Sequence, residues 1–241
     1  MICSEQKEID YSMRWRLTTS TPLEDDFWDF SSEFIEECDQ DINSFLKTKQ
    51  VLDSFEERTK EYPVVIPLYR DIVDTQIFIR YLLIDFLILW RLFRSAGSAV
   101  EKQFVVRKLY GTLNEGFKNL HGGFNTSTYA KSYWHKFEGY QSILPESLKK
   151  EYLDLSSTFM AAANNKDWWK NERCADDHYN ISTLSNLRSR YQKMTPNDLE
   201  RELSTLHTLL NQVFIFVNKL DKEYEDIIKT CGGKLVKKQM P

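Results

Sequence analysis

Glycine and proline are scarce in this sequence, which contains 8 Gly and 6 Pro among its 241 residues. Both residue types mark turns, because Gly tolerates positive φ angles and Pro interrupts helices. A chain with few turn residues favours long helices joined by few connections. No segment alternates apolar and polar residues for long enough to indicate a strand. The sequence therefore predicts an all-α fold: a single-domain bundle of about six to eight helices over residues 1–241, with residues 1–20 as an N-terminal extension and residues 234–241 as a basic C-terminal tail.

Paired cysteines and the common catalytic motifs are also missing. The four cysteines lie far apart and form no Cys-x-x-Cys pair, so neither a zinc site nor a disulfide scaffold is indicated. None of the four histidines belongs to the Glu-x-x-His motif of di-iron bundles. The sequence has no Gly-rich phosphate loop, nucleophile elbow or His-Glu-x-x-His motif. No metal or other cofactor is therefore expected.

A long uninterrupted apolar run is the third feature that the sequence lacks. The most apolar stretch, residues 77–93, is broken by Arg80 and Asp85, whereas a membrane span needs about 20 mostly apolar residues. The first 16 residues contain no apolar core of signal-peptide length. We therefore expect a cytoplasmic protein with no membrane partner. The net charge of -4 also argues against a surface made entirely for nucleic acid, although a local basic patch remains compatible with it.

The apolar stretch over residues 77–93 is the central helix of the predicted fold. Its hydrophobic residues cover nearly the whole helix circumference, which is the pattern of a helix surrounded by others. Leu83 and Phe86 are therefore expected to be buried. The five-residue offset between Arg80 and Asp85 places the two on different sides of the helix. Each charge needs a partner on a neighbouring helix or a route to the rim, because an unpaired buried charge is very costly.

Capping signals and apolar spacing place the other helices. Thr21 and Pro22 open a first helix of roughly 35 residues, with one apolar and one acidic face, and Pro67 opens the central helix, which runs to about Arg94. Ser98 and Glu101 form a capping box for a third helix that stops at residues 122–123. A short aromatic helix around residues 129–140, a helix from Pro145, a short helix over residues 182–191 and a final helix from residue 195 follow. The apolar stripe expected on the third helix comprises Val100, Phe104, Leu109, Leu113, Phe117 and Leu120.

One polar stretch, residues 164–180, interrupts this periodic pattern. It contains Arg173 and His178, which are separated by four residues, and a loop with such residues between patterned helices is a functional hint. Here the chain resembles the HEPN superfamily of helical bundles, whose signature is an Arg followed after four to six residues by a His. A second match, Arg201 to His207, lies on or beside the apolar stripe of the last helix, where a structural histidine is favoured. Cys174 departs from the polar residue that usually follows the Arg in the family.

The resemblance implies metal-independent RNA cleavage, in which a ribose 2′-hydroxyl attacks the neighbouring phosphate. His178 would be the general acid or base, and Arg173 would stabilise charge on the phosphate. The residues that would orient the histidine or contact RNA are Asn171, Asp176, Tyr179, Trp168 and Trp169. Because family members often form the site from two copies of the motif, a homodimer is also implied.

Structural roles remain open for all of these residues. Trp168 and Trp169 are also suited to packing, Asp176 to a solvated position, and Arg173 to an ion pair with a neighbouring acid. Two hypotheses therefore stand at this point. The first is a HEPN-like protein that acts on RNA, and the second is a non-catalytic helical interaction module that binds a protein, as an antitoxin or scaffold does.

Overall fold

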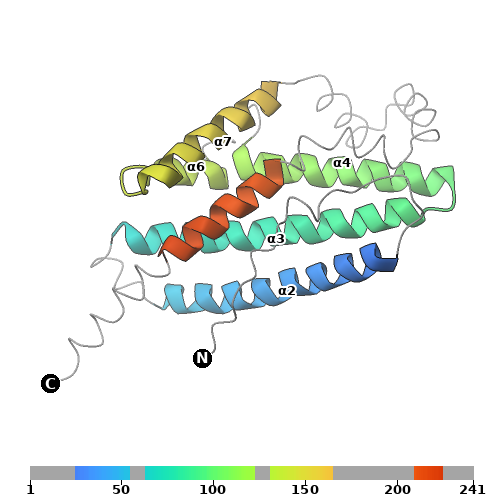
Figure 1. The fold of residues 1–241 in the computed structure, drawn as a ribbon, viewed down its shortest axis with the longest axis horizontal. Helices are drawn as coiled ribbons and strands as arrows, with labels where there is room; N and C mark the ends of the chain where they lie inside the picture. The colour runs from blue at the N-terminus through green and yellow to red at the C-terminus, as the bar shows by residue number, and fades with distance from the viewer. Residues whose placement is uncertain (1–24, 55–62, 123–130, 165–208, 225–241) are drawn as a thin grey trace.

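The computed structural model of the chain describes residues 25–54, 63–122, 131–164 and 209–224. These residues are 88% helical and contain six helices and no strand, which confirms the predicted all-α bundle. The predicted N-terminal extension, the helix at residues 182–191 and the basic tail lie outside them. The helices are α2 (Asp25–Asp53), α3 (Val65–Ser95), α4 (Ala99–His121), α6 (Tyr133–Glu138), α7 (Glu146–Asn164) and the helix of residues 209–224 (Figure 1).

The three longest helices, α2, α3 and α4, lie side by side with α3 in the middle (Figure 1). Lys49 of α2 pairs with Asp74 early in α3, whereas Asp41 pairs with Arg80 further along, so α2 and α3 are antiparallel. Helix α4 returns along α3 after a short turn at residues 96–98. Gly116 allows a close approach there, because a Cβ atom at this position would lie 2.6 Å from the side chain of Leu82 on α3.

The remaining helices dock on this layer through aromatic side chains. Phe78 of α3 stacks on Tyr133 of α6, with ring centroids 4.9 Å apart. The neighbouring Trp134 is fully buried and contacts Tyr152 of α7 at 4.8 Å and Phe216 of the 209–224 helix at 5.4 Å. Its indole N–H donates to Ser156 Oγ at 2.8 Å, so the polar edge of this large side chain is satisfied. Trp134 therefore joins α6 to α7 and to the 209–224 helix, which is distant in the sequence.

Helix α3 is central, as predicted. Leu83 and Phe86 are 4% and 1% exposed, and both belong to the one hydrophobic core that all six described helices share. The helix begins at Val65 rather than Pro67. Pro67 lies within its first turn, where the missing proline N–H has no helical acceptor to lose.

Helix α4 has the predicted ends. The Ser98 side chain accepts from the Glu101 backbone N–H at 3.2 Å, the Glu101 carboxylate accepts from the Ser98 N–H at 2.9 Å, and Gly122 has a φ of 87°. Its predicted inner stripe is confirmed at Leu109, Phe117 and Leu120, which are buried, and is wrong at two positions. Val100 and Phe104 are 63% and 51% exposed, since they lie across the helix from Leu109.

Apolar side chains at helical spacing are buried on other helices as well. Phe34, Cys38 and Ile42 of α2 are buried. The buried residues of α7 and of the 209–224 helix include Leu148, Tyr152, Leu155, Phe159, Leu210, Val213, Val217, Leu220 and Tyr224.

Two positions on α3 test whether this helix is the core of the fold. Phe86→Ala should lower the free energy of unfolding by about 3–5 kcal/mol, because the truncation leaves a cavity at a buried aromatic position. The control is Ile88→Ala, two residues away on the same helix and 42% exposed, which should change stability by less than about 0.5 kcal/mol. Urea denaturation of the two variants measures both values. Equal losses would show that α3 is not buried on the Phe86 side.

Candidate functional site

The seven candidate site residues predicted from the sequence lie outside the described residues. They are Arg173, His178, Asn171, Asp176, Tyr179, Trp168 and Trp169. Arg201 and His207 of the second motif match lie outside as well. The structure does describe the helices on either side of this segment. Phe159 on α7 and Leu209 at the start of the following helix are both buried, so the described helices on either side of the segment are anchored in the core.

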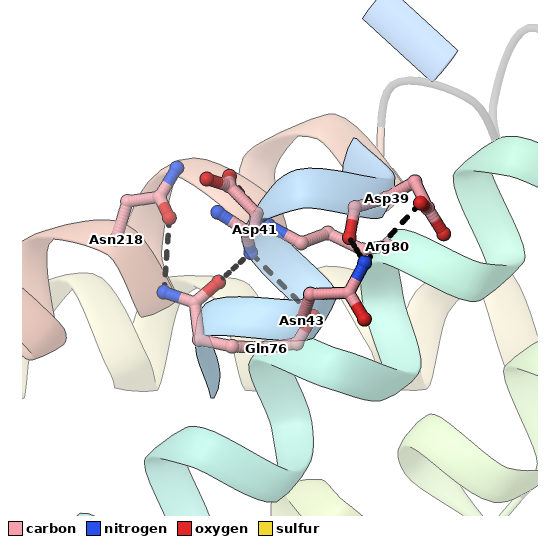
Figure 2. A network of polar contacts seen from close by, with 6 residues as sticks. All are labelled: Asp39, Asp41, Asn43, Gln76, Arg80 and Asn218. Atoms are coloured by element: carbon pink, nitrogen blue, oxygen red, sulfur yellow. Dashed lines mark hydrogen bonds and ion pairs between the residues drawn. The ribbon is translucent and has the colours of Figure 1, made fainter. Parts of the chain in front are cut away.

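A buried arginine on α3 lies at the centre of a polar network that links three helices. Arg80 is 5% exposed, and its Nε donates to Asp41 Oδ2 of α2 at 2.8 Å (Figure 2). Its Nη1 donates to the side-chain oxygen of Gln76. The amide of Gln76 in turn donates to Asn218 Oδ1 at 2.9 Å, on the 209–224 helix. The network thus ties α2, α3 and the last described helix together.

Aromatic rings complete the surroundings of Arg80. Its guanidinium carbon lies 4.8 Å from the ring centroid of Phe45 and 5.1 Å from that of Phe214. Both contacts are cation–π interactions, which gain strength when the cation is desolvated. The expectation that charges on the central helix need partners or a route to the rim is therefore confirmed, because Arg80 is paired and Asp85 is exposed.

The thiol of Cys38 lies close to this network but is not reactive. Burial raises the pKa of Cys38 to about 12, and Arg80 lowers it only in part. The thiolate is the nucleophilic form of cysteine. Cys38 therefore remains a protonated core side chain at neutral pH.

A second polar cluster joins α6 to α3. Asp71 accepts from Lys136 Nζ at 2.8 Å and from the Tyr140 hydroxyl at 2.9 Å. Burial and the bond to Asp71 raise the pKa of Tyr140. Asp74, one turn further along α3, pairs with Lys49 of α2, and this bond raises the pKa of Lys49. Each carboxylate is held by a cation from another helix, so the cluster fixes how the helices dock.

The two described histidines have structural surroundings. His121, the last residue of α4, is 2% exposed, and its ring stacks on Phe159 with centroids 4.6 Å apart. Burial lowers the pKa of His121 to about 4, so the ring is neutral at pH 7. His135 lies at the surface with its Nδ1 2.6 Å from Glu138 Oε2. His121 is thus a core residue and His135 a member of a surface pair.

A small open depression lies between α7 and the 209–224 helix. Its volume is about 250 Å³, which is below the range of about 300–1,000 Å³ for small-molecule sites. Glu151 in its wall forms an ion pair with Lys219 Nζ at 2.9 Å.

Within the described ranges, no group of three or more His, Cys, Asp and Glu side chains could hold a metal ion. No helix of those ranges is sufficiently long and apolar to cross a membrane.

One side of α3 exposes large apolar side chains. Tyr81, Ile88 and Leu92 are 51%, 42% and 48% exposed, and Asp85 is exposed between them. Their spacing of i, i+4, i+7 and i+11 places all four on one side of the helix, which we term the α3 face. The same side is covered earlier in α3, where Phe78 packs under Tyr133 of α6.

Acidic side chains lie within the α3 face and on the neighbouring helix α2. The pKa of Asp85 is raised because neighbouring apolar groups partly desolvate its carboxyl group. Helix α2, which flanks α3, exposes five carboxylates between residues 31 and 46 and has no Lys or Arg in that range. These five residues are Glu33, Glu36, Glu37, Asp39 and Asp41. The α3 face cannot be recognised from the sequence, because its residue types match those of the buried sides of the same helix.

The lowered pKa of His121 predicts a pH dependence of stability. Between pH 6.5 and about 4 the unfolded chain binds a proton that the folded chain does not, so the free energy of unfolding falls as the pH is lowered through this window. From pH 7 to pH 5 the loss due to His121 should be about 2 kcal/mol. Urea denaturation at both pH values should show that His121→Phe removes this part of the loss. An unchanged loss in the variant would contradict the burial of a neutral His121.

The described residues thus fall into two groups. The Arg80 network, the Asp71 cluster and His121 hold helices together, whereas the α3 face leaves three large apolar side chains about half exposed. The α3 face is therefore the candidate functional site that the structure adds to the Arg173 and His178 pair. No protein-family profile matches the chain, and comparisons with curated proteins and with solved structures likewise give no match.

Proposed function

We propose that this chain is a helical protein-interaction module that binds another protein through the α3 face. The observation that supports the proposal is the stripe of Tyr81, Ile88 and Leu92, each about half exposed on the central helix. Contiguous exposed apolar side chains on a folded domain mark interaction sites more often than isolated ones do. The core of the bundle is already filled by the opposite side of α3, which includes Leu83 and Trp90.

The bundle also holds this face in a fixed position. Arg80 anchors α3 to α2 and, through Gln76, to the 209–224 helix, while Gly116 lets α4 approach α3 closely. A binding surface that is rigid before binding loses less conformational entropy when the partner docks. The α3 face is therefore suited to recognition without rearrangement.

The test of this proposal compares two double variants in cells of the source organism. Ile88→Lys with Leu92→Lys alters the α3 face, and Leu153→Lys with Met160→Lys places the same charges on equally exposed apolar positions of α7. We expect a partner that copurifies with the wild type and the α7 variant, and that is lost from the α3 variant. The partner should then bind the purified wild-type chain directly. All three proteins should have similar melting temperatures, because the substituted positions are exposed.

Equal recovery of the partner by both double variants would contradict the proposal. A lowered melting temperature of the α3 variant alone would show that the stripe contributes to folding instead. Single substitutions at Ile88 and Leu92 would then separate binding from stability.

RNA cleavage through Arg173 and His178 is the second candidate function. The supporting observations are the four-residue spacing of the pair and its place between two helices anchored in the core by Phe159 and Leu209. In this proposal His178 transfers the proton and Arg173 stabilises the phosphate. Asn171, Asp176 and Tyr179 orient the histidine or contact the RNA, and the two tryptophans, Trp168 and Trp169, stack on unpaired bases.

An assay with a mixed RNA pool in EDTA tests the second candidate. His178→Ala should lower the cleavage rate by about 10²–10⁴-fold, the usual contribution of a general acid or base. Arg173→Ala should weaken the same activity, and neither change should lower the melting temperature substantially. His207→Ala is the matched control, since the sequence favours a structural role for that residue. Intact RNA at high concentrations of the wild type, or full cleavage by His178→Ala, would contradict catalysis.

A further inference from the structure

The chemistry of the α3 face indicates what kind of partner it fits. We infer that the α3 face binds a basic amphipathic α-helix of another protein, with apolar residues on Tyr81, Ile88 and Leu92 and a Lys or Arg beside Asp85. The inference rests on the proposed interaction function and specifies its partner. It does not depend on the RNA proposal.

The shape of the face favours a helical partner. Tyr81 and Leu92 are separated by eleven residues of one straight helix, or about 17 Å along its axis. An apolar stripe of this length matches the i, i+4, i+7 and i+11 positions of a second helix that packs along α3.

The charge of the face favours a basic partner. Asp85 lies in the middle of the stripe, and an apolar partner would remove its remaining water, which is costly unless a cation replaces that water. Helix α2, which packs against α3, adds negative charge, because it exposes Glu33, Glu36, Glu37 and Asp39 and contains no base between residues 31 and 46. Lys or Arg residues beside the apolar side of the partner helix would pair with Asp85 and would be attracted by the negative charge of α2.

The same charges disfavour a second copy of this chain. A two-fold axis parallel to α3 would bring two Asp85 side chains to the same level along the helix pair. A two-fold axis across α3 would stack the acidic helix α2 on its own copy. Like charges placed opposite each other cost affinity, so self-association is the less favourable use of this face.

The probe for this inference is a designed peptide of Leu and Lys, about 18 residues or five helical turns long. A peptide with the same Leu pattern and Glu in place of Lys is the charge control. Fluorescence anisotropy with the full chain should give a Kd in the micromolar range for the Lys peptide, about 1–10 µM, and binding at least about tenfold weaker for the Glu peptide.

Variants of the chain locate the binding site of this probe. Ile88→Lys and Asp85→Asn should each weaken binding of the Lys peptide about tenfold, a change of about 1.4 kcal/mol. Leu153→Lys and Asp154→Asn on α7 make the same chemical changes away from the face and should leave the Kd unchanged. Equal binding by all variants would show general attraction to a chain of net charge -4, and would overturn the inference.

Sedimentation of the same proteins tests whether a second copy of this chain, and not another protein, binds the α3 face. A wild-type species of twice 28.6 kDa that Ile88→Lys converts to monomer, and that Asp85→Asn stabilises, would identify the occupant as a second copy. That result would overturn the inference and leave the interaction function standing. Failure of the peptide to bind a monomeric wild-type chain would also overturn it, whereas the copurification experiment decides the interaction function separately.

Discussion

The buried charge of Arg80 is the constraint on which the arrangement of the helices depends. A guanidinium that is 5% exposed is tolerated only where other groups replace its water. Its partners are Asp41 on α2, Gln76 one turn away on α3, and the rings of Phe45 and Phe214. Gln76 extends the network to Asn218. The first and last described helices must therefore both be docked before the charge of the central helix is compensated, which couples segments far apart in the sequence.

Helix α3 has one side buried in the core and another side at the surface. Phe86 and Trp90 fill the core, whereas Ile88 and Leu92 lie at the surface beside an acidic helix. Because packing holds the inner side, the outer side is presented as a rigid surface. The proposed interaction function therefore follows from the position of α3 rather than from a catalytic group. The RNA proposal concerns a different part of the chain, between α7 and the 209–224 helix, so the two functions do not exclude each other.

The ion pairs of the described surface explain why clusters of titratable groups need not be active sites. Asp71 contacts Lys136 and Tyr140, and Asp74 contacts Lys49. The residue types in these contacts resemble those of an acid–base catalytic site. Each carboxylate, however, is matched by a cation from another helix. Such pairs fix docking geometry, and partly exposed ones contribute little net stability.

The sequence by itself determined the described helices, both ends of α4 and most of the core. The capping box of Ser98 and Glu101, the positive φ of Gly122 and the burial of Phe86 were all predictable, because caps and apolar periodicity are encoded within a few neighbouring residues. The Arg173 and His178 pair was recognised by spacing alone. Only the tertiary structure decided that Asp41 compensates Arg80, that Phe104 faces outward and that Tyr81, Ile88 and Leu92 remain exposed. Exposure of an apolar side chain depends on which distant helices pack against it, and the residue type does not indicate which helices these are.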